Sequence, residues 1–137
     1  MHRIGPPACV PQVPAFEVVS GSCTVGSDKC VYSDNFGTGQ EYSDKQDCVI
    51  KQNTPFQLDV RSFDVEYHYL CGWDFLKVNG VNYCGNDQGP HGVTPAADSE
   101  LVWHITGARV VHGPQTGFKI CPVSRHSRRA TLAQTGP

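Results

Sequence analysis

Two carboxylates near the middle of the chain are the side chains best suited to binding chemistry. Glu66 and Asp74 lie eight residues apart, in the loop that enters a short apolar strand. Carboxylate oxygens are ligands for hard cations such as calcium, which takes about six to eight oxygen atoms, so two acids do not complete a site. The alternative is that both are loop acids that accept hydrogen bonds from backbone amides.

Three aromatic residues lie between these acids in the sequence, namely Tyr67, Tyr69 and Trp73. Aromatic rings beside a polar rim suit a protein interface or stacking against a sugar ring. Trp73 has a further interpretation, because it can pack over a neighbouring disulfide. The segment is therefore a candidate binding surface for a protein, with a glycan as the alternative ligand.

The histidines do not indicate catalysis. Catalytic histidines act together with a nucleophile or a set of metal ligands. No serine or cysteine nucleophile motif accompanies those of this chain, among them His68, His91, His104 and His112. We therefore expect a protein that is not an enzyme.

The seven cysteines point to disulfides. None forms a Cys-x-x-Cys pair and no histidine pair has zinc-finger spacing, so a structural zinc site is disfavoured. Scattered cysteines persist in oxidising compartments, which predicts an extracellular or secreted protein. Seven is an odd number, so at least one thiol is unpaired or pairs outside this chain.

Size and charge narrow the class further. A chain of 137 residues suits one domain. A net charge of -2 without a basic face argues against nucleic acid. No apolar run approaches the roughly 20 residues that cross a bilayer, so we expect no membrane insertion. The first residues lack the apolar core of a signal peptide, so we expect a piece of a longer secreted or membrane-anchored protein, or a signal removed or replaced.

Composition divides the chain into three parts. Residues 1–20 contain four prolines, which fix φ and remove backbone donors, so they are predicted to form an extended lead-in. Residues 21–122 form the domain. Residues 123–137 have few apolar anchors and are predicted to be a flexible tail or linker.

The domain has the pattern of β-strands. Apolar and polar residues alternate from Phe56 to Val60, whereas Phe63 and Val65 continue on the opposite parity, so a bulge or a turn near Ser62 is expected if both sets face the core. A strand over residues 74–78 is expected to return through the Asn79-Gly80 turn. Further strands are predicted over 30–32, 48–51, 101–105 and 117–121. Many short strands with loop-rich connections indicate an all-β sandwich.

Six short blocks also follow one another in the order of a known family. They are residues 33–37 (Ser-Asp-Asn-Phe-Gly), 47–50 (Asp-Cys-Val-Ile), 63–66 (Phe-Asp-Val-Glu), 73–78 (Trp-Asp-Phe-Leu-Lys-Val), 83–85 (Tyr-Cys-Gly) and 116–118 (Thr-Gly-Phe). Together they resemble the CUB domain over about residues 23 to 121. The resemblance implies an antiparallel jelly-roll β-sandwich stapled by disulfides.

The resemblance also implies disulfide partners. Cys71 is expected to pair with Cys84. Cys48 is expected to pair with an upstream cysteine, for which Cys23 has the better family spacing and Cys30 is a competitor. Whichever of Cys23 and Cys30 does not pair with Cys48 could pair with Cys121.

Many CUB domains hold calcium at one end of the sandwich, and the resemblance carries this site over in part. Glu66 and Asp74 match two of the acidic positions, and Tyr42 could hydrogen-bond them. The third acidic position falls near Thr106, which has no carboxylate. Any calcium binding is therefore expected to be weak, because charge count controls affinity.

These observations predict a noncatalytic extracellular recognition module that binds a protein partner. The expected surface is partly acidic and aromatic and comprises residues 66–74, Tyr42 and residues 106–114. A carbohydrate-binding module would use Tyr67, Tyr69 or Trp73 as a stacking platform. Alternatively, the protein could be a structural subunit of a larger extracellular assembly, joined to its neighbours through a spare cysteine and its extended ends.

Overall fold

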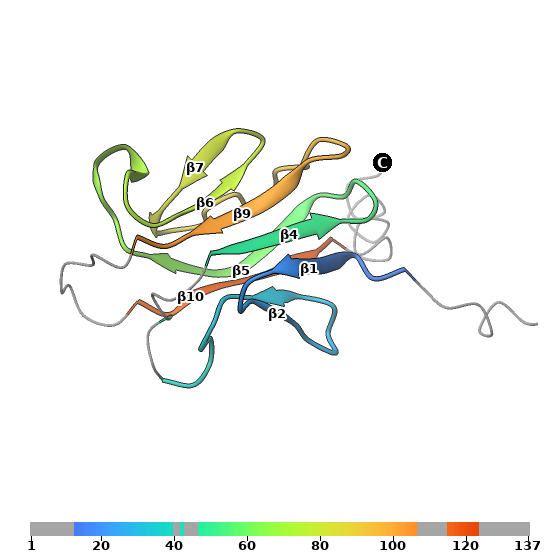
Figure 1. Cartoon of the computed structure of the whole chain (residues 1–137), viewed down its shortest axis with the longest axis horizontal. Helices are drawn as coiled ribbons and strands as arrows, with labels where there is room; N and C mark the ends of the chain where they lie inside the picture. Colours follow the sequence, from blue (N-terminus) through green and yellow to red (C-terminus); the bar gives the residue numbers. More distant parts are fainter. Residues whose placement is uncertain (1–12, 40–41, 43–46, 107–114, 124–137) are drawn as a thin grey trace, which may run out of the picture.

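Strands form nearly all the regular structure of this protein (Figure 1). The computed structural model describes residues 13–39, 42, 47–106 and 115–123. No α-helix occurs in these ranges, and no helix there could therefore span a membrane. The elements are β1 (Phe16–Ser20), β2 (Thr24–Val25), β3 (Val31–Tyr32), β4 (Cys48–Gln52), β5 (Leu58–Val65), the short 3-10 helix η2 (Tyr69–Cys71), β6 (Phe75–Val78), β7 (Val81–Tyr83), β8 (Gly85–Asn86), β9 (Glu100–His104) and β10 (Gly117–Pro122).

The strands form two five-stranded antiparallel sheets. The first has the order β1-β4-β9-β6-β7 and the second the order β2-β3-β10-β5-β8. In Figure 1, β9 and β4 of the first sheet lie over β5 of the second. The predicted all-β sandwich is therefore confirmed, whereas its jelly-roll connectivity stays a prediction.

The core between the sheets is centred on Trp103 of β9, which is fully buried. Its ring meets those of Tyr42 and Phe118 edge to face, with centroids 5.0 and 5.2 Å apart. Such pairs add about 0.5–1.5 kcal/mol each beyond the area they bury. Aliphatic residues from both sheets complete this cluster, among them Ile50, Leu58, Leu76, Leu101 and Ile120.

The expected bulge lies in the pairing of β5 with β10. Lys119 is opposite Ser62 and Ile120 is opposite Val60, so Arg61 has no partner in the register. The extra residue moves Phe63 onto the same buried face as Leu58, although the two differ in parity. The bulge is thus confirmed, and it leaves the Arg61 side chain exposed.

The Asn79-Gly80 turn is confirmed as well. Both residues have positive φ, 54° and 79°, as the two central positions of a type I′ hairpin turn require. Val78 pairs with Val81 across the turn.

Three disulfides connect six of the seven cysteines. The predicted pair of Cys71 with Cys84 is present, and Cys23 is the partner of Cys48. Cys30 then joins Cys121. Three disulfides indicate an oxidising environment. Cys9 lies outside the described residues.

The boundary of the predicted lead-in at residue 20 is wrong, because residues 16–20 form strand β1. Phe16 is buried and meets the ring of Phe56 edge to face at 5.1 Å. β1 pairs with β4 in register from Phe16 opposite Gln52. The last proline of this part is Pro14, so every residue of β1 retains the amide that a sheet requires.

Candidate functional site

Glu66 and Asp74 lie at the ends of two strands. Glu66 follows β5 directly and Asp74 precedes β6, and both side chains are fully buried. Carboxylates are seldom fully buried, since desolvation is costly unless hydrogen bonds compensate. The expectation that these two acids present an acidic surface is therefore wrong.

Tyr42 joins the two strand ends. Its hydroxyl donates to Oδ2 of Asp74 at 2.6 Å and accepts the backbone N–H of Glu66 at 3.1 Å. A phenol can do both at once because it has one proton and lone pairs to accept another. The ring itself is buried against Trp103. Tyr42 thus fastens the loop between β5 and β6 to the core.

Thr106 hydrogen-bonds to the other oxygen of the Asp74 carboxylate. Its backbone N–H donates to Oδ1 of Asp74 at 3.0 Å, and its hydroxyl lies 3.3 Å from that atom. Both oxygens of Asp74 therefore accept hydrogen bonds from the protein. This arrangement favours the interpretation of Asp74 as a loop acid held by backbone and side-chain donors.

The described residues do not form a complete calcium site. No group of three or more acids, histidines or cysteines within them could share a metal ion. Thr106 contributes no charge, and calcium requires about six to eight oxygens. Residues 107–114, included in the expected surface, lie outside the described ranges. Weak calcium binding therefore stays a prediction.

The loop above the acids exposes apolar side chains. We call residues 67–73 the aromatic loop; Tyr67, Tyr69 and Leu70 in it are 66%, 73% and 75% exposed. In Figure 1 the loop projects beyond the end of β5, at the left of the view. Neighbouring exposed apolar residues on a soluble domain are typical of an interaction site.

The aromatic loop has a defined backbone. Leu70 and Cys71 have φ of 57° and 52°, in the left-handed region that costs such residues about 1–2 kcal/mol each. The N–H of Cys71 donates to the carbonyl of His68 at 2.7 Å, and the disulfide ties Cys71 to Cys84. The surrounding bonds therefore impose a conformation that these residues would otherwise avoid.

Trp73 supports the loop from one side. Its ring is half-buried and stacks on the imidazole of His68, with centroids 4.0 Å apart and planes 12° apart. Trp73 therefore differs from Tyr67 and Tyr69, whose rings are largely exposed. The rings of Tyr67 and Tyr69 are therefore available to a ligand, whereas the ring of Trp73 stabilises the loop from within.

The described histidines have separate partners. His68 stacks on Trp73, whereas Nδ1 of His104 lies 2.8 Å from a carboxylate oxygen of Asp47. Nδ1 of His91 accepts a hydrogen bond from the backbone N–H of Val60 in β5. His112 lies outside the described residues.

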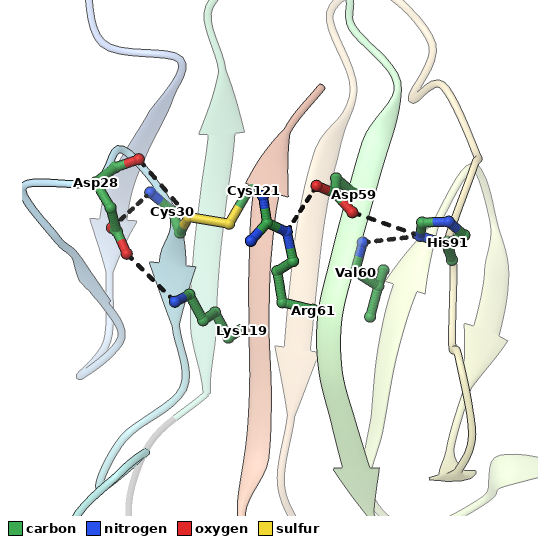
Figure 2. A network of polar contacts seen from close by, with 8 residues as sticks. All are labelled: Asp28, Cys30, Asp59, Val60, Arg61, His91, Lys119 and Cys121. Carbon is green, nitrogen blue, oxygen red and sulfur yellow. Dashed lines mark hydrogen bonds and ion pairs between the residues drawn. A yellow bond between two sulfur atoms is a disulfide. The ribbon is translucent and has the colours of Figure 1, made fainter. Parts of the chain in front are cut away.

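A charged groove on the second sheet was not anticipated from the sequence. Its volume is about 520 Å³ and its lining includes the cysteines of one disulfide. Figure 2 shows the polar network around it. Its cations are Lys29, Arg61 and Lys119, which are far apart in the sequence, so no local motif marks them. Only strand pairing brings them together.

Comparison with known proteins leaves the family open. No protein-family model matches the chain, and neither does any curated protein or any solved structure.

Proposed function

We propose that this protein is a noncatalytic extracellular recognition module that binds a partner protein through its aromatic loop. The observation that carries the proposal is the group Tyr67, Tyr69 and Leu70, all exposed on a loop held by the Cys71–Cys84 disulfide.

The chemistry of the loop suits a protein interface. Tyrosine is enriched among the residues that dominate binding energy, because its ring buries a large area while its hydroxyl hydrogen-bonds. Leu70, which follows Tyr69 and precedes Cys71 in the sequence, adds an exposed apolar anchor. Because no charge lies among these three side chains, binding through them should depend little on salt.

The backbone of the loop supports the same function. Ordering a flexible loop on binding costs about 0.5–1.5 kcal/mol for each immobilised side chain, in addition to the backbone. Here the disulfide and the contacts of Asp74 with Tyr42 and Thr106 hold the loop in place before a partner arrives. The buried acids therefore position the surface and do not contact the partner.

Secretion and a CUB-like fold belong to the same proposal. Three disulfides support an extracellular location. The sandwich of two antiparallel sheets and the Cys71–Cys84 pair agree with the resemblance to CUB domains. A weakly bound calcium ion near Asp74 is a subsidiary proposal, on which partner binding does not depend.

A carbohydrate ligand is the second candidate. The exposed rings of Tyr67 and Tyr69 favour it, since an exposed aromatic face can stack on a sugar. A glycan array with the parent chain and a Tyr67→Ser/Tyr69→Ser variant separates the two candidates. Glycan binding that disappears in the variant would favour the carbohydrate function.

The main experiment compares matched surface variants. The loop variant is Tyr69→Ser/Leu70→Ser, and the control is Val19→Ser/Val81→Ser, which removes exposed apolar side chains elsewhere. Each immobilised protein captures partners from medium conditioned by the source tissue, and purified partners are then measured by biolayer interferometry. We expect the parent and the control to bind one partner equally, and the loop variant at least tenfold more weakly through faster dissociation.

Circular dichroism and thermal melting verify that each variant is folded. Substitutions at exposed positions usually change stability by less than about 0.5 kcal/mol. Equal affinity of the loop variant and the parent for every partner would show that the aromatic loop is not the interface.

A further inference from the structure

Cations gather at one place on the second sheet. Three of the five described Lys and Arg residues, Lys29, Arg61 and Lys119, line the groove introduced above. The other two, Lys51 and Lys77, belong to β4 and β6 of the first sheet. The described residues carry more acids than bases, so this grouping runs against the overall charge.

The groove has a fixed floor. Cys30 and Cys121 line it and are joined by a disulfide, which connects the residue before β3 to β10. β10 also pairs with β5, where the bulge leaves Arg61 outside the register. Figure 2 shows the disulfide between Lys119 on one side and Arg61 on the other. The two cations therefore arise from hydrogen-bonded neighbouring strands, of which β10 also carries the disulfide.

Arg61 is oriented by a single acid. Its Nε–H donates to Oδ2 of Asp59 at 2.7 Å, and its side chain is 57% exposed. Within the described residues, the two terminal NH₂ groups of the guanidinium have no hydrogen-bond partner. These groups form the planar fork that binds an oxyanion through two parallel hydrogen bonds.

Lys119 is held on the opposite side. Its ammonium lies 3.5 Å from Oδ2 of Asp28 and 5.4 Å from the ring centroid of Tyr32, and its side chain is 28% exposed. The hydrogen bond from the Tyr32 hydroxyl, followed by that from the backbone N–H of Cys30, keeps the pKa of Asp28 below its usual value. Asp28 therefore stays charged and fixes the lysine, which has further N–H donors to offer.

The third cation is the least restrained. Lys29 is exposed, and within the described residues it has no acidic partner. Its φ of 71° places it in the left-handed region of a tight turn, closed by its N–H donating to the carbonyl of Gly26 at 2.9 Å. The side chain thus leaves a defined backbone position at the edge of the groove.

His91 does not neutralise the acid beside Arg61. Its Nδ1 accepts the backbone N–H of Val60 at 3.0 Å, so that nitrogen carries no proton. The 3.9 Å separation from Oδ1 of Asp59 is therefore not an ion pair. Asp59 and Asp28 offset two of the three cations, and one positive charge remains in excess.

We propose that this groove binds the sulfate groups of a sulfated polysaccharide. The fork of Arg61 takes two oxygens of one sulfate, and the ammonium groups of Lys29 and Lys119 take neighbouring anionic groups. An oxidising, extracellular setting favours this polyanion over nucleic acid. The open groove of about 520 Å³ has room for a sugar ring with its substituents.

The test uses a fluorescein-labelled heparin hexasaccharide and its chemically desulfated counterpart. Fluorescence anisotropy with the full chain, at about 50 and 200 mM salt, should show binding of the sulfated probe only, with affinity falling as salt rises. We expect Lys29→Gln/Arg61→Gln to weaken binding at least tenfold. Lys51→Gln/Lys77→Gln removes equal charge from the first sheet and should change the affinity less than twofold.

Three further measurements complete the experiment. Arg61→Lys retains the charge without the fork and should weaken binding several-fold, which tests the geometry. Arg125→Gln/Arg128→Gln/Arg129→Gln removes cations of the C-terminal segment and should leave most of the affinity. Vesicles containing phosphatidylserine should bind no better than neutral vesicles.

Four results would overturn the inference. They are equal binding of the desulfated probe, equal losses in the two double variants, complete loss in the C-terminal variant, and groove-dependent binding of anionic vesicles without binding of the hexasaccharide. Arg61→Lys, the mildest change, decides the matter if the groove double variant does not fold. The aromatic loop is unaltered throughout, so failure here leaves the proposed function intact.

Discussion

The aromatic loop and the charged groove distribute polar and apolar groups in opposite ways. At the loop, the two flanking carboxylates are buried, whereas the side chains of Tyr67, Tyr69 and Leu70 are exposed. In the groove, Arg61 and Lys119 lie at the surface above a buried disulfide. A disulfide braces each region. The difference shows that disulfides can brace two surfaces whose binding should respond differently to salt, since binding at the groove should weaken as salt rises whereas binding at the loop should change little.

The two regions also differ in what their acids do. Asp74 is buried and accepts bonds from Tyr42 and Thr106, so its role is structural. Asp28 and Asp59 are partly exposed and orient cations. Exposed ion pairs contribute about 0–1 kcal/mol, whereas a buried donor left without an acceptor costs about 1–3 kcal/mol. The acids of the loop should therefore matter more for stability.

The largest expected effect concerns the two disulfides. Cys30 and Cys121 are separated by 91 residues and Cys71 and Cys84 by 13. In the chain-entropy model, replacing the first pair with serines should cost about 4–5 kcal/mol and replacing the second about 3 kcal/mol. Urea unfolding followed by tryptophan fluorescence measures both. The reverse order would mean that loop length does not control these contributions.

The second effect concerns Asp74. Replacing it with alanine removes the carboxylate to which the Tyr42 hydroxyl and the Thr106 amide donate, which should cost about 2–4 kcal/mol. Asp59→Ala in the groove should cost less than about 1 kcal/mol, since its partner Arg61 remains hydrated. Asp74→Asn, which keeps one acceptor oxygen, should fall between them. Equal costs at Asp74 and Asp59 would refute the contrast between the regions.

The third effect concerns calcium. With a Kd of about 1 mM, calcium at that concentration should add about 0.4 kcal/mol of stability. Thr106→Asp should strengthen binding by supplying a third carboxylate, and Asp74→Ala should abolish it. Lys29→Gln/Arg61→Gln should leave it unchanged.

Calorimetry and thermal melting with and without calcium measure this effect. If Thr106→Asp binds no better than the parent, the placement of Thr106 in a calcium site is wrong. Micromolar affinity of the parent would mean that a further ligand exists.

The smallest effect concerns Asp28. Its pKa is held below the usual 3.8, mainly by the Tyr32 hydroxyl, so its contribution is present above that value and is lost as pH falls through the lower folded-state pKa. The difference in melting temperature between the parent and Asp28→Asn should shrink between about pH 6 and about pH 2. A difference independent of pH would show that the charge of Asp28 does not stabilise the groove.

Much of the fold could be predicted because local patterns determine it. The alternation around Leu58 and the change of parity at Phe63 predicted both a strand and its bulge. Asn79-Gly80 predicted a hairpin turn. Strand β1 was missed because the prolines before it obscured a single short alternation of apolar and polar residues. Strands β2 and β8 have two residues each and are too short to show a period.

The sequence by itself determined the all-β class, the turn chemistry and the oxidising setting, because these depend on residue type and near neighbours. The tertiary structure alone decided that Asp74 is buried while the nearby tyrosines are exposed, and that Lys29, Arg61 and Lys119 share a groove. Burial and charge grouping depend on which strands pair and which loops close over them. Those long-range contacts join residues that no local pattern connects.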